Sequence, residues 1–315
     1  MEEECEPPFK RSPKGTSVSE FTMLRHTFCH IPGIGVTTEK RLWADGIVSW
    51  ESALELGSGR MTPRRRETVA RYVAESRIHE QEQNPRYFAD RLPANLHWRL
   101  FPAFRDGVVY LDIETTGLEP WDHSITSIAI YDGNEIRTYV QGQNLEDFER
   151  DIEEYTIIVT YNGKCFDIPF IQWYFRTRLD HVQIDLRYVL RSLGYAGGLK
   201  GCEAQLGIDR GELIGVDGYF AVLLWDDYDR RGNEKALETL LAYNVEDVVN
   251  LETLMVMAYN MKVKETPLGE GLLVDLPLRP EIPFKPHLGT IQRLKDRIAG
   301  PGSWYESRHW TKEGK

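Results

Sequence analysis

The sequence predicts an α/β fold, in which helices flank a mixed β-sheet and a small α-helical N-terminal module precedes the sheet. A β-branched, apolar run at residues 108–115 (VVYLDIET) predicts a buried strand. Two alternating runs on either side of Asp132-Gly133-Asn134 predict a β-hairpin. Helical patterns dominate from residue 199 onward. Strands therefore come first and helices later, around one sheet.

The chain divides into five segments by composition. Residues 1–20 are polar and contain Pro, Gly and Ser, which predicts a disordered tail. Residues 21–80 read as a module of short helices, one of which starts at Pro63. Residues 81–106, rich in proline and aromatics, are expected to be a connector. The α/β domain is expected at 107–262 and a C-terminal extension at 263–315.

The bulk properties set the class of protein. The 315 residues suffice for one large and one small domain, and 41% hydrophobic residues allow a sizeable core. No apolar run reaches the roughly 18 residues that a membrane-spanning helix needs. The first ten residues are acidic and lack the apolar stretch of a secretory signal, so we expect a cytoplasmic protein.

The charge is unevenly distributed. The net charge of −11 argues against a protein that coats nucleic acid. Residues 1–110 hold 16 Lys and Arg against 15 Asp and Glu, whereas the remainder holds 22 against 34. A metal site needs concentrated negative charge, which the cations would partly neutralise.

The four cysteines do not form a recognisable metal motif. Cys5, Cys29, Cys165 and Cys202 include no Cys-x-x-Cys pair, so we interpret them as reduced thiols. The alternative is an iron–sulfur cluster built from four distant cysteines.

Two carboxylates share one face of the first predicted strand. Asp112 and Glu114 are two residues apart, and strand periodicity places both on the same side, with Ile113 pointing the other way into apolar packing. Neighbouring carboxylates repel one another unless a positive charge separates them, and a divalent cation is the simplest remedy. The alternative is two solvated acids on a half-exposed strand.

Two further acids lie at the ends of later elements. The sequence predicts a strand that ends at Asn162 and a helix that begins near Asp167. The Asp167 carboxylate either caps that helix or projects toward the pair. Tyr243 and Asp247 are four residues apart on one face of an apolar helix. A buried Asp needs a partner, because an unpaired buried charge is costly. We expect Asn244 and Glu246 on other faces, with Glu246 a solvated helix acid.

Together these segments resemble the motifs of the DEDD exonuclease superfamily, which has an RNase H-like fold. Residues 112–114 resemble its Asp-x-Glu strand, residues 162–167 its Asn-x-x-x-Phe-Asp element, and residues 243–247 the Tyr-x-x-x-Asp helix of the DEDDy variant. The resemblance covers about residues 107–260. The sequences GGLKGCEAQLGI and AVLLWDDY resemble stand-alone YprB-like proteins more than polymerase proofreading domains.

The resemblance implies hydrolysis of phosphodiester bonds with two divalent cations, Mg²⁺ or Mn²⁺. Asp112 would bridge the two ions, Glu114 and Asp247 would hold the ion that activates water, and Asp167 would act through the second ion's water shell. Tyr243 would orient the attacking water or the scissile phosphate, since a phenol is a poor base at neutral pH.

The resemblance also implies contacts with the substrate. The turn from Thr115 to Leu118 would lie against the terminal nucleotide, with Leu118 packing on a base, and Asn162 would contact the nucleic-acid backbone. The alternative is a plain turn that ends the strand.

The N-terminal module contains a second resemblance. The sequence HIPGIGVTTEKRLWADGI, with a turn at residues 32–35, resembles a helix-hairpin-helix motif. The backbone N–H groups around Gly33 and Gly35 could approach a phosphate, with Lys40 and Arg41 following on the next helix. The alternatives are a tight turn between packed helices or a protein-docking element. Arg60, Arg64, Arg65 and Arg66 form a local basic patch or a solvated helix start.

The sequence therefore predicts a 3′→5′ exonuclease, whose polarity comes from the resemblance. DNA is preferred to RNA as the substrate because helix-hairpin-helix modules commonly bind DNA. The alternatives are a structure-specific endonuclease, and a non-catalytic nucleic-acid-binding or scaffold protein with the same fold. The intact carboxylate set argues against the non-catalytic alternative.

Overall fold

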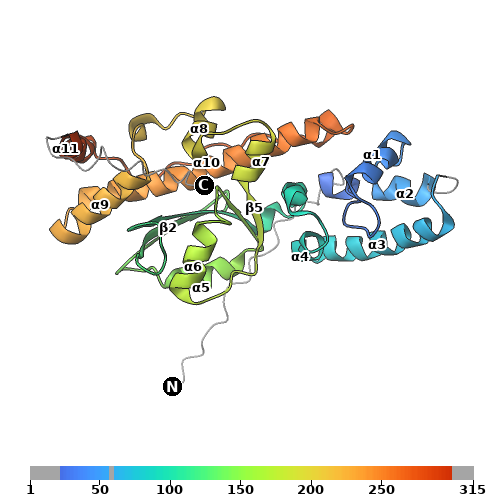
Figure 1. Cartoon of the computed structure of the whole chain (residues 1–315), viewed down its shortest axis with the longest axis horizontal. Coiled ribbons are helices and arrows are strands. Elements are labelled where there is room, and N and C mark those ends of the chain that lie inside the picture. Colours follow the sequence, from blue (N-terminus) through green and yellow to red (C-terminus); the bar gives the residue numbers. More distant parts are fainter. Residues whose placement is uncertain (1–21, 57–59, 300–315) are drawn as a thin grey trace, which may run out of the picture.

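The computed structural model describes residues 22–56 and 60–299 (Figure 1). The predicted tail at 1–20, Cys5 and the last part of the C-terminal extension lie outside the described residues. Cys29, Cys165 and Cys202 form no disulfide among the described residues. Within the described ranges, no helix combines the length and the apolar character needed to cross a membrane.

A mixed five-stranded sheet forms the centre of the molecule, which confirms the predicted α/β fold class. Its order is β3-β2-β1-β4-β5. The antiparallel part pairs β1 with β2 and β2 with β3, whereas β1, β4 and β5 run parallel. The strands are β1 (Val108–Thr115), β2 (Ile125–Tyr131), β3 (Ile136–Val140), β4 (Ile157–Thr160) and β5 (Val182–Asp185). The first four were predicted, and the short β5 was not.

Each face of the sheet is covered by helices. Val109, Leu111 and Ile113 of β1 belong to the apolar cluster under α5 (Asp147–Asp151) and α6 (Asp167–Phe175). The alternate residues, such as Val108 and Tyr110, pack with α10 on the other face. The long helix α10 (Glu234–Lys264) runs across that face (Figure 1). Asp112 and Glu114 therefore point toward α10, and Ile113 points away, as predicted.

The short helix η4 (Ile152–Glu154) follows α5 on the face of the sheet opposite α10. The further helices on the α10 side are α7 (Leu186–Ser192), α8 (Gly198–Gln205), η5 (Gly211–Leu213), α9 (Gly218–Arg231), η6 (Gly269–Leu272) and α11 (Leu288–Ala299). The C-terminal segment is tied to α9 by Asp227, which pairs with Arg231 and Arg293. Hydrogen bonding from Arg293 lowers the pKa of Asp227 to about 2.

The N-terminal module is helical, but the helix expected before the Pro-Gly-Ile-Gly turn is only one 3-10 turn. Its elements are η1 (Met23–His26), α1 (Val36–Ala44), α2 (Trp50–Leu56) and α3 (Pro63–Gln81). The backbone N–H groups of Phe28 and Cys29 donate to the Glu39 carboxylate at 2.7 and 3.1 Å. The Thr27 carbonyl accepts from the Trp50 indole. These backbone groups are therefore bonded to side chains and do not continue a helix.

The segment expected as a connector is packed into the core. It contains α4 (Pro85–Ala89), η2 (Ala94–Leu100) and η3 (Arg105–Gly107). Phe88, Phe101 and Phe104 are fully buried, and one apolar cluster includes them, the N-terminal module and the α10 face of the sheet. Removal of residues 1–80 would therefore strip part of the main core.

Candidate metal centre

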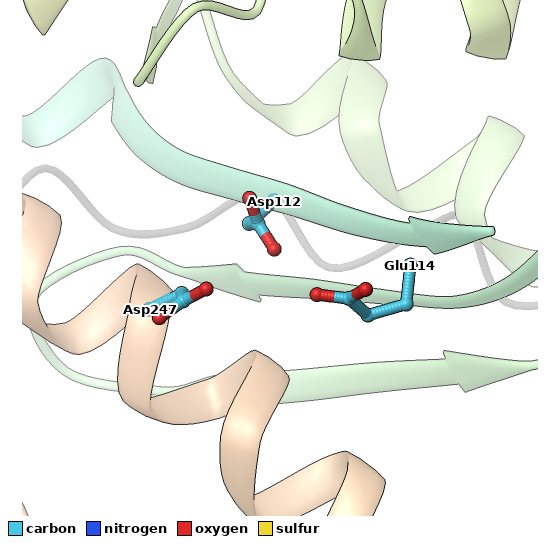
Figure 2. A group of neighbouring side chains, drawn as sticks. All are labelled: Asp112, Glu114 and Asp247. Atoms are coloured by element: carbon cyan, nitrogen blue, oxygen red, sulfur yellow. The ribbon is translucent and has the colours of Figure 1, made fainter. Parts of the chain in front are cut away.

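Three carboxylates converge between the sheet and α10. Asp112 and Glu114 come from alternate positions of β1, and Asp247 comes from the middle of α10 (Figure 2). Each offers an oxygen, and the three oxygens lie within 4.8 Å of one another. All three side chains are buried. The structure thus brings together three of the four acids that the sequence singled out.

Asn244 holds Asp112 in place. Its Nδ2 donates to Asp112 Oδ2 at 2.9 Å and to the Asp112 carbonyl at 3.3 Å, while its Oδ1 accepts from Ser127 Oγ at 3.0 Å. Asn244 precedes Asp247 by three residues, so both project toward β1. The expectation that Asn244 lies on another face was wrong, and the i, i+3 spacing was the signal that could have revealed it.

Asp167 lies beside the cluster and is not one of its three members. It is the first residue of α6, and its buried Oδ1 accepts from the backbone N–H of Ile113 at 3.2 Å. The pairing of β4 with β1 ends at Tyr110, so Asp167 provides an acceptor beyond the end of that ladder. Ile113, whose N–H donates to Asp167, lies between Asp112 and Glu114 in the sequence. Its role as a metal ligand remains a prediction.

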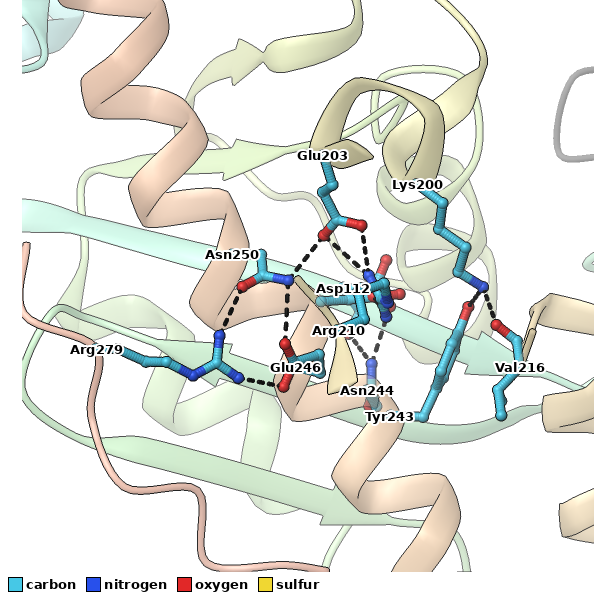
Figure 3. Close-up of polar contacts among 11 residues, drawn as sticks. Asp112, Lys200, Glu203, Arg210, Val216, Tyr243, Asn244, Glu246, Asn250 and Arg279 are labelled. Atoms are coloured by element: carbon cyan, nitrogen blue, oxygen red, sulfur yellow. Dashed lines mark hydrogen bonds and ion pairs between the residues drawn. The ribbon is translucent and has the colours of Figure 1, made fainter. Parts of the chain in front are cut away.

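Arg210 neutralises part of the negative charge. It forms a buried ion pair with Asp247, and its Nη1 donates to both oxygens of Glu203 at 2.9 and 2.7 Å (Figure 3). Burial raises the pKa of Glu203, whereas the two carboxylates raise the pKa of Arg210. Arg210 precedes Asp247 by 37 residues, so no local pattern marked it as a partner.

A second layer of polar contacts supports Glu203. Asn250 Nδ2 donates to Glu203 at 2.8 Å and to Glu246 at 3.2 Å. Arg279, from the C-terminal segment, pairs with Glu246 and donates to Asn250 Oδ1 at 3.1 Å (Figure 3). The expectation of a solvated Glu246 was therefore wrong. The acid is buried because Arg279 reaches it from a distant part of the chain.

Tyr243 points its hydroxyl at a lysine next to the cluster. Lys200 Nζ donates to Tyr243 Oη at 2.7 Å and to the Val216 carbonyl (Figure 3). Burial, and then the charges of Asp247 and Glu114, raise the pKa of Tyr243 well above its ordinary value. Burial also lowers the pKa of Lys200. The phenol is therefore protonated at neutral pH, which suits orientation better than proton abstraction.

The donor set fits divalent cations such as Mg²⁺ or Mn²⁺. Four carboxylates, from Asp112, Glu114, Asp247 and Glu203, gather around the two cations Arg210 and Lys200, so the sum of these charges is negative. Asp112, Glu114 and Asp247 offer only oxygen ligands, which hard divalent cations prefer. Binding of such ions would remove the repulsion among these like charges.

The residues predicted to contact the substrate differ in exposure and in hydrogen bonding. Thr115 is buried and donates to the Gly117 carbonyl at 2.6 Å, and Leu118 is exposed in the same turn. Asn162 has a left-handed backbone, with φ of 66°, and its Oδ1 accepts from Arg187 at 2.5 Å. Its side chain is therefore directed to Arg187 in this structure.

Asp185 at the end of β5 was missed by the sequence reasoning. Its carboxylate accepts from the backbone N–H groups of Asn162, Lys164 and Arg187 at 2.8, 3.2 and 3.0 Å. Burial raises its pKa. The carboxylate holds the loop that leads from β4 to Asp167. The alternating sequence Val-Gln-Ile-Asp was the available signal for both β5 and this residue.

The Pro-Gly-Ile-Gly turn is open to solvent. Ile34 N–H donates to the Ile31 carbonyl at 3.0 Å, and Gly33 has φ of +82°, as a type II turn requires. Gly35 precedes α1, on which Lys40 and Arg41 are exposed. A Cβ added at Gly33 or Gly35 would meet no atom within 4 Å. The geometry leaves room for a ligand at the backbone.

The match to a family model agrees with the fold. Residues 109–259 match the family model of the RNase_H superfamily. Among solved structures, the chain is similar to the family B DNA polymerase of the hyperthermophilic archaeon Pyrobaculum calidifontis, with 15% identity and a TM-score of 0.34. That match covers 56% of this chain and 31% of the polymerase chain. No curated protein matches.

Proposed function

We propose that this chain, whose residues 109–259 match the RNase_H superfamily model, is a metal-dependent nuclease that acts as a DEDDy-type 3′→5′ exonuclease. The observation that carries the proposal is the group of three buried carboxylates whose oxygens lie within 4.8 Å of one another. Such a concentration of like charge is stable only with compensating cations. Two-metal hydrolysis of phosphodiesters uses a centre of this kind.

The residues would divide the work as follows. Asp112, Glu114 and Asp247 would hold two divalent ions, Mg²⁺ or Mn²⁺, and Asp167 would act through their bound water. When bound, the ions supply charge stabilisation and an activated water. Asn244 holds Asp112, and Arg210 holds Asp247, so both ligands are oriented before an ion arrives.

Tyr243 would orient the attacking water or the scissile phosphate. Its oxygen accepts from Lys200, so the direction of its own O–H is constrained. Tyr243→Phe retains the ring's packing and removes the hydroxyl. We expect slower cleavage with Mn²⁺ affinity retained, measured by single-turnover kinetics and by calorimetric titration. An unchanged rate would make Tyr243 a core residue only.

DNA is the favoured substrate, with RNA the alternative. The support for this preference is the exposed Pro-Gly-Ile-Gly turn and the two cations Lys40 and Arg41 behind it. Leu118, exposed in the turn after β1, would pack against the terminal base. Thr115 and Asn162 would contribute through the loops that they shape.

The central test is cleavage of substrates labelled at the 5′ end, single- and double-stranded, DNA and RNA, with Mg²⁺, Mn²⁺ or chelator. We expect shortening from the 3′ end in single-nucleotide steps that requires metal. Asp112→Asn and Asp247→Asn should each reduce the rate by more than about 100-fold, since loss of an outer partner of a metal ligand alone costs 10–100-fold. Glu149→Gln, on the exposed side of α5, is the matched control and should cut normally.

Other products would point elsewhere. Internal fragments would indicate an endonuclease that uses the same centre. Tight binding without cleavage under every metal condition would indicate the non-catalytic alternative. Full activity in Asp112→Asn or Asp247→Asn would refute the assignment of the centre.

A further inference from the structure

A second concave site lies between the N-terminal module and the sheet. It is a cleft of about 540 Å³ bounded by α1, η2, the carboxyl end of β5, α7 and the last turns of α10. None of the residues Asp112, Glu114 and Asp247 lines it. Its walls are held in place because the module and the α10 face of the sheet share one apolar cluster.

Two lysines line different walls of the cleft, and the charge of one of them, Lys164, partly offsets the rise that burial causes in the pKa of Asp185. Lys40 comes from α1 and Lys164 from the loop between β4 and α6. Neither forms an ion pair within residues 22–56 and 60–299. A third lysine, Lys262, is different because it pairs with Glu265 at 2.8 Å.

The other charged groups of the cleft are already satisfied. Arg99 is buried and paired with Glu39 at 2.8 Å. The Asp185 carboxylate accepts three backbone N–H groups. With Arg99 and Lys262 paired, Lys40 and Lys164 stand against Asp185 alone, so the lining of the cleft is net positive although the chain as a whole is acidic. A site of this charge selects an anionic ligand.

An aromatic ring lines the same cleft, with its hydroxyl 3.3 Å from Cys165 Sγ. Tyr188 on α7 is 46% exposed, and apolar Val36, Leu96 and Val189 line the same cleft. Proteins bind single-stranded nucleic acid on surfaces that combine exposed aromatic rings with cations. The bases stack on the rings, and the phosphates contact the cations. In a duplex the bases are stacked on one another and do not reach such a ring.

We propose that this cleft binds a single-stranded segment of the nucleic-acid substrate, upstream of the end held at the metal centre. Lys40 and Lys164 contact its phosphates, and Tyr188 stacks on a base. The inference rests on the proposed nuclease function and adds to it the path that the substrate strand follows from the metal centre into the cleft.

The topology connects the cleft with the metal centre. β1, β4 and β5 are parallel neighbours, so their carboxyl ends share one edge of the sheet. Asp185 at the end of β5 lies two strand spacings, about 10 Å, from β1. Lys262 follows Asp247 by 15 residues on α10, about 22 Å at the helical rise. At about 3.4 Å per stacked nucleotide, the cleft receives roughly the third to sixth nucleotide from the end.

Binding without metal separates this inference from catalysis. We would measure fluorescence anisotropy of a labelled single-stranded oligonucleotide of about ten nucleotides in chelator, at several salt concentrations. For the double variant K40Q/K164Q, loss of two phosphate contacts should make the slope of log affinity against log salt shallower by about 1.4. Tyr188→Ala should weaken binding at least about fivefold, and Tyr188→Phe should restore it.

The controls use the opposite side of the sheet and the length of the ligand. Arg150→Gln on α5 removes an exposed cation from the other face and should leave affinity and salt slope nearly unchanged. Far-ultraviolet circular dichroism and melting curves should match among all variants. A mononucleotide should not compete with the oligonucleotide, and a dinucleotide should bind the wild type and K40Q/K164Q equally.

The outcomes of the two proposals are distinct. Equal affinity and equal slope for wild type and K40Q/K164Q would overturn the cleft proposal, even if cleavage follows the acids as expected. Full competition by a mononucleotide would also overturn it and make the cleft a nucleotide pocket. Loss of binding in the cleft variants supports the proposed path of the single strand through the cleft. If the wild type also cuts no strand, only the nuclease proposal fails.

Discussion

Two buried carboxylate sites in this protein differ in how their charge is balanced. Glu39 in the N-terminal module is fully buried, yet it accepts two backbone N–H groups and pairs with Arg99. The site around Asp112 is equally buried, but three carboxylates share it and their sum with the nearby cations is negative.

The difference shows that burial of an acid does not by itself indicate function. Glu39 and Arg99 form a closed pair that determines the path of the chain at Phe28 and Cys29. At the Asp112 site the carboxylates outnumber the nearby cations Arg210 and Lys200, and a bound ion would reduce the repulsion among them. An excess of this kind distinguishes a candidate metal centre from a structural ion pair.

The largest expected effect is a difference in stability between a variant of the Glu39 site and a variant of the Asp112 site. Glu39→Gln leaves Arg99 buried without its counter-charge and should lower the free energy of unfolding by about 3–5 kcal/mol. Asp112→Asn removes one of three like charges and should leave the metal-free stability unchanged or raise it. Urea unfolding of both variants in chelator checks this. An equal loss of stability in Asp112→Asn and Glu39→Gln would contradict the proposed difference between a structural ion pair and a metal centre.

The second-largest expected effect tests whether Arg210 and a bound metal ion stabilise the same carboxylates. Arg210→Gln leaves Asp247 and Glu203 without their shared cation, and should lower the metal-free free energy of unfolding by about 3 kcal/mol. Mn²⁺ should stabilise this variant by more than it stabilises the wild type, because the ion takes the place of the lost cation beside Asp247; an ion at 100 times its dissociation constant adds about 2.7 kcal/mol to a folded state that alone binds it.

Two controls accompany that experiment. Arg230→Gln breaks an exposed pair with Asp226 and should cost less than about 1 kcal/mol with no response to metal. Glu39→Gln should show no rescue beyond the wild-type response to Mn²⁺. Equal Mn²⁺ responses in wild type and Arg210→Gln would argue that Arg210 acts independently of the centre.

The third effect is acid sensitivity of the N-terminal module. Burial, and then the cations Arg91 and Arg99, lower the pKa of His30 from 6.5 to about 3. The unfolded chain therefore takes up a proton below about pH 6.5 that the folded chain does not. Stability from this group is full above that pH and falls as the pH drops toward 3, by about 2 kcal/mol at pH 5.

The measurement is a difference between two proteins. Urea unfolding of wild type and His30→Gln at several pH values isolates this contribution, because the other titrating groups are shared. The wild type should lose stability more steeply than the variant between neutral pH and pH 5. Parallel curves would show that His30 does not control the acid sensitivity of the module.

The smallest effect concerns the exposed turn of the module. Gly33→Ala forces a side chain into a left-handed backbone and should cost about 1–2 kcal/mol. Gly35→Asn meets open space at φ of −95° and keeps a good helix-capping residue, so stability should be unchanged. If the backbone N–H groups of the turn bind phosphate, both variants should bind a labelled duplex more weakly. Unchanged duplex affinity in Gly35→Asn would leave the turn as a packing element.

The sequence by itself determined the elements that carry the acids. The β-branched run predicted β1, and its period of two placed Asp112 and Glu114 on one face. The apolar helix around Tyr243 and Asp247 was equally clear, because helical spacing is local. The hairpin at residues 125–140 followed from its Asp-Gly-Asn turn.

The tertiary structure alone decided which groups meet these acids. Arg210 reaches Asp247, and Arg279 reaches Glu246, from positions 37 and 33 residues away. The packing of residues 85–104 likewise depends on neighbours that are distant in sequence. Local periodicity specifies the face of an element on which a residue lies. The partner on that face depends on which segments the folded core brings together.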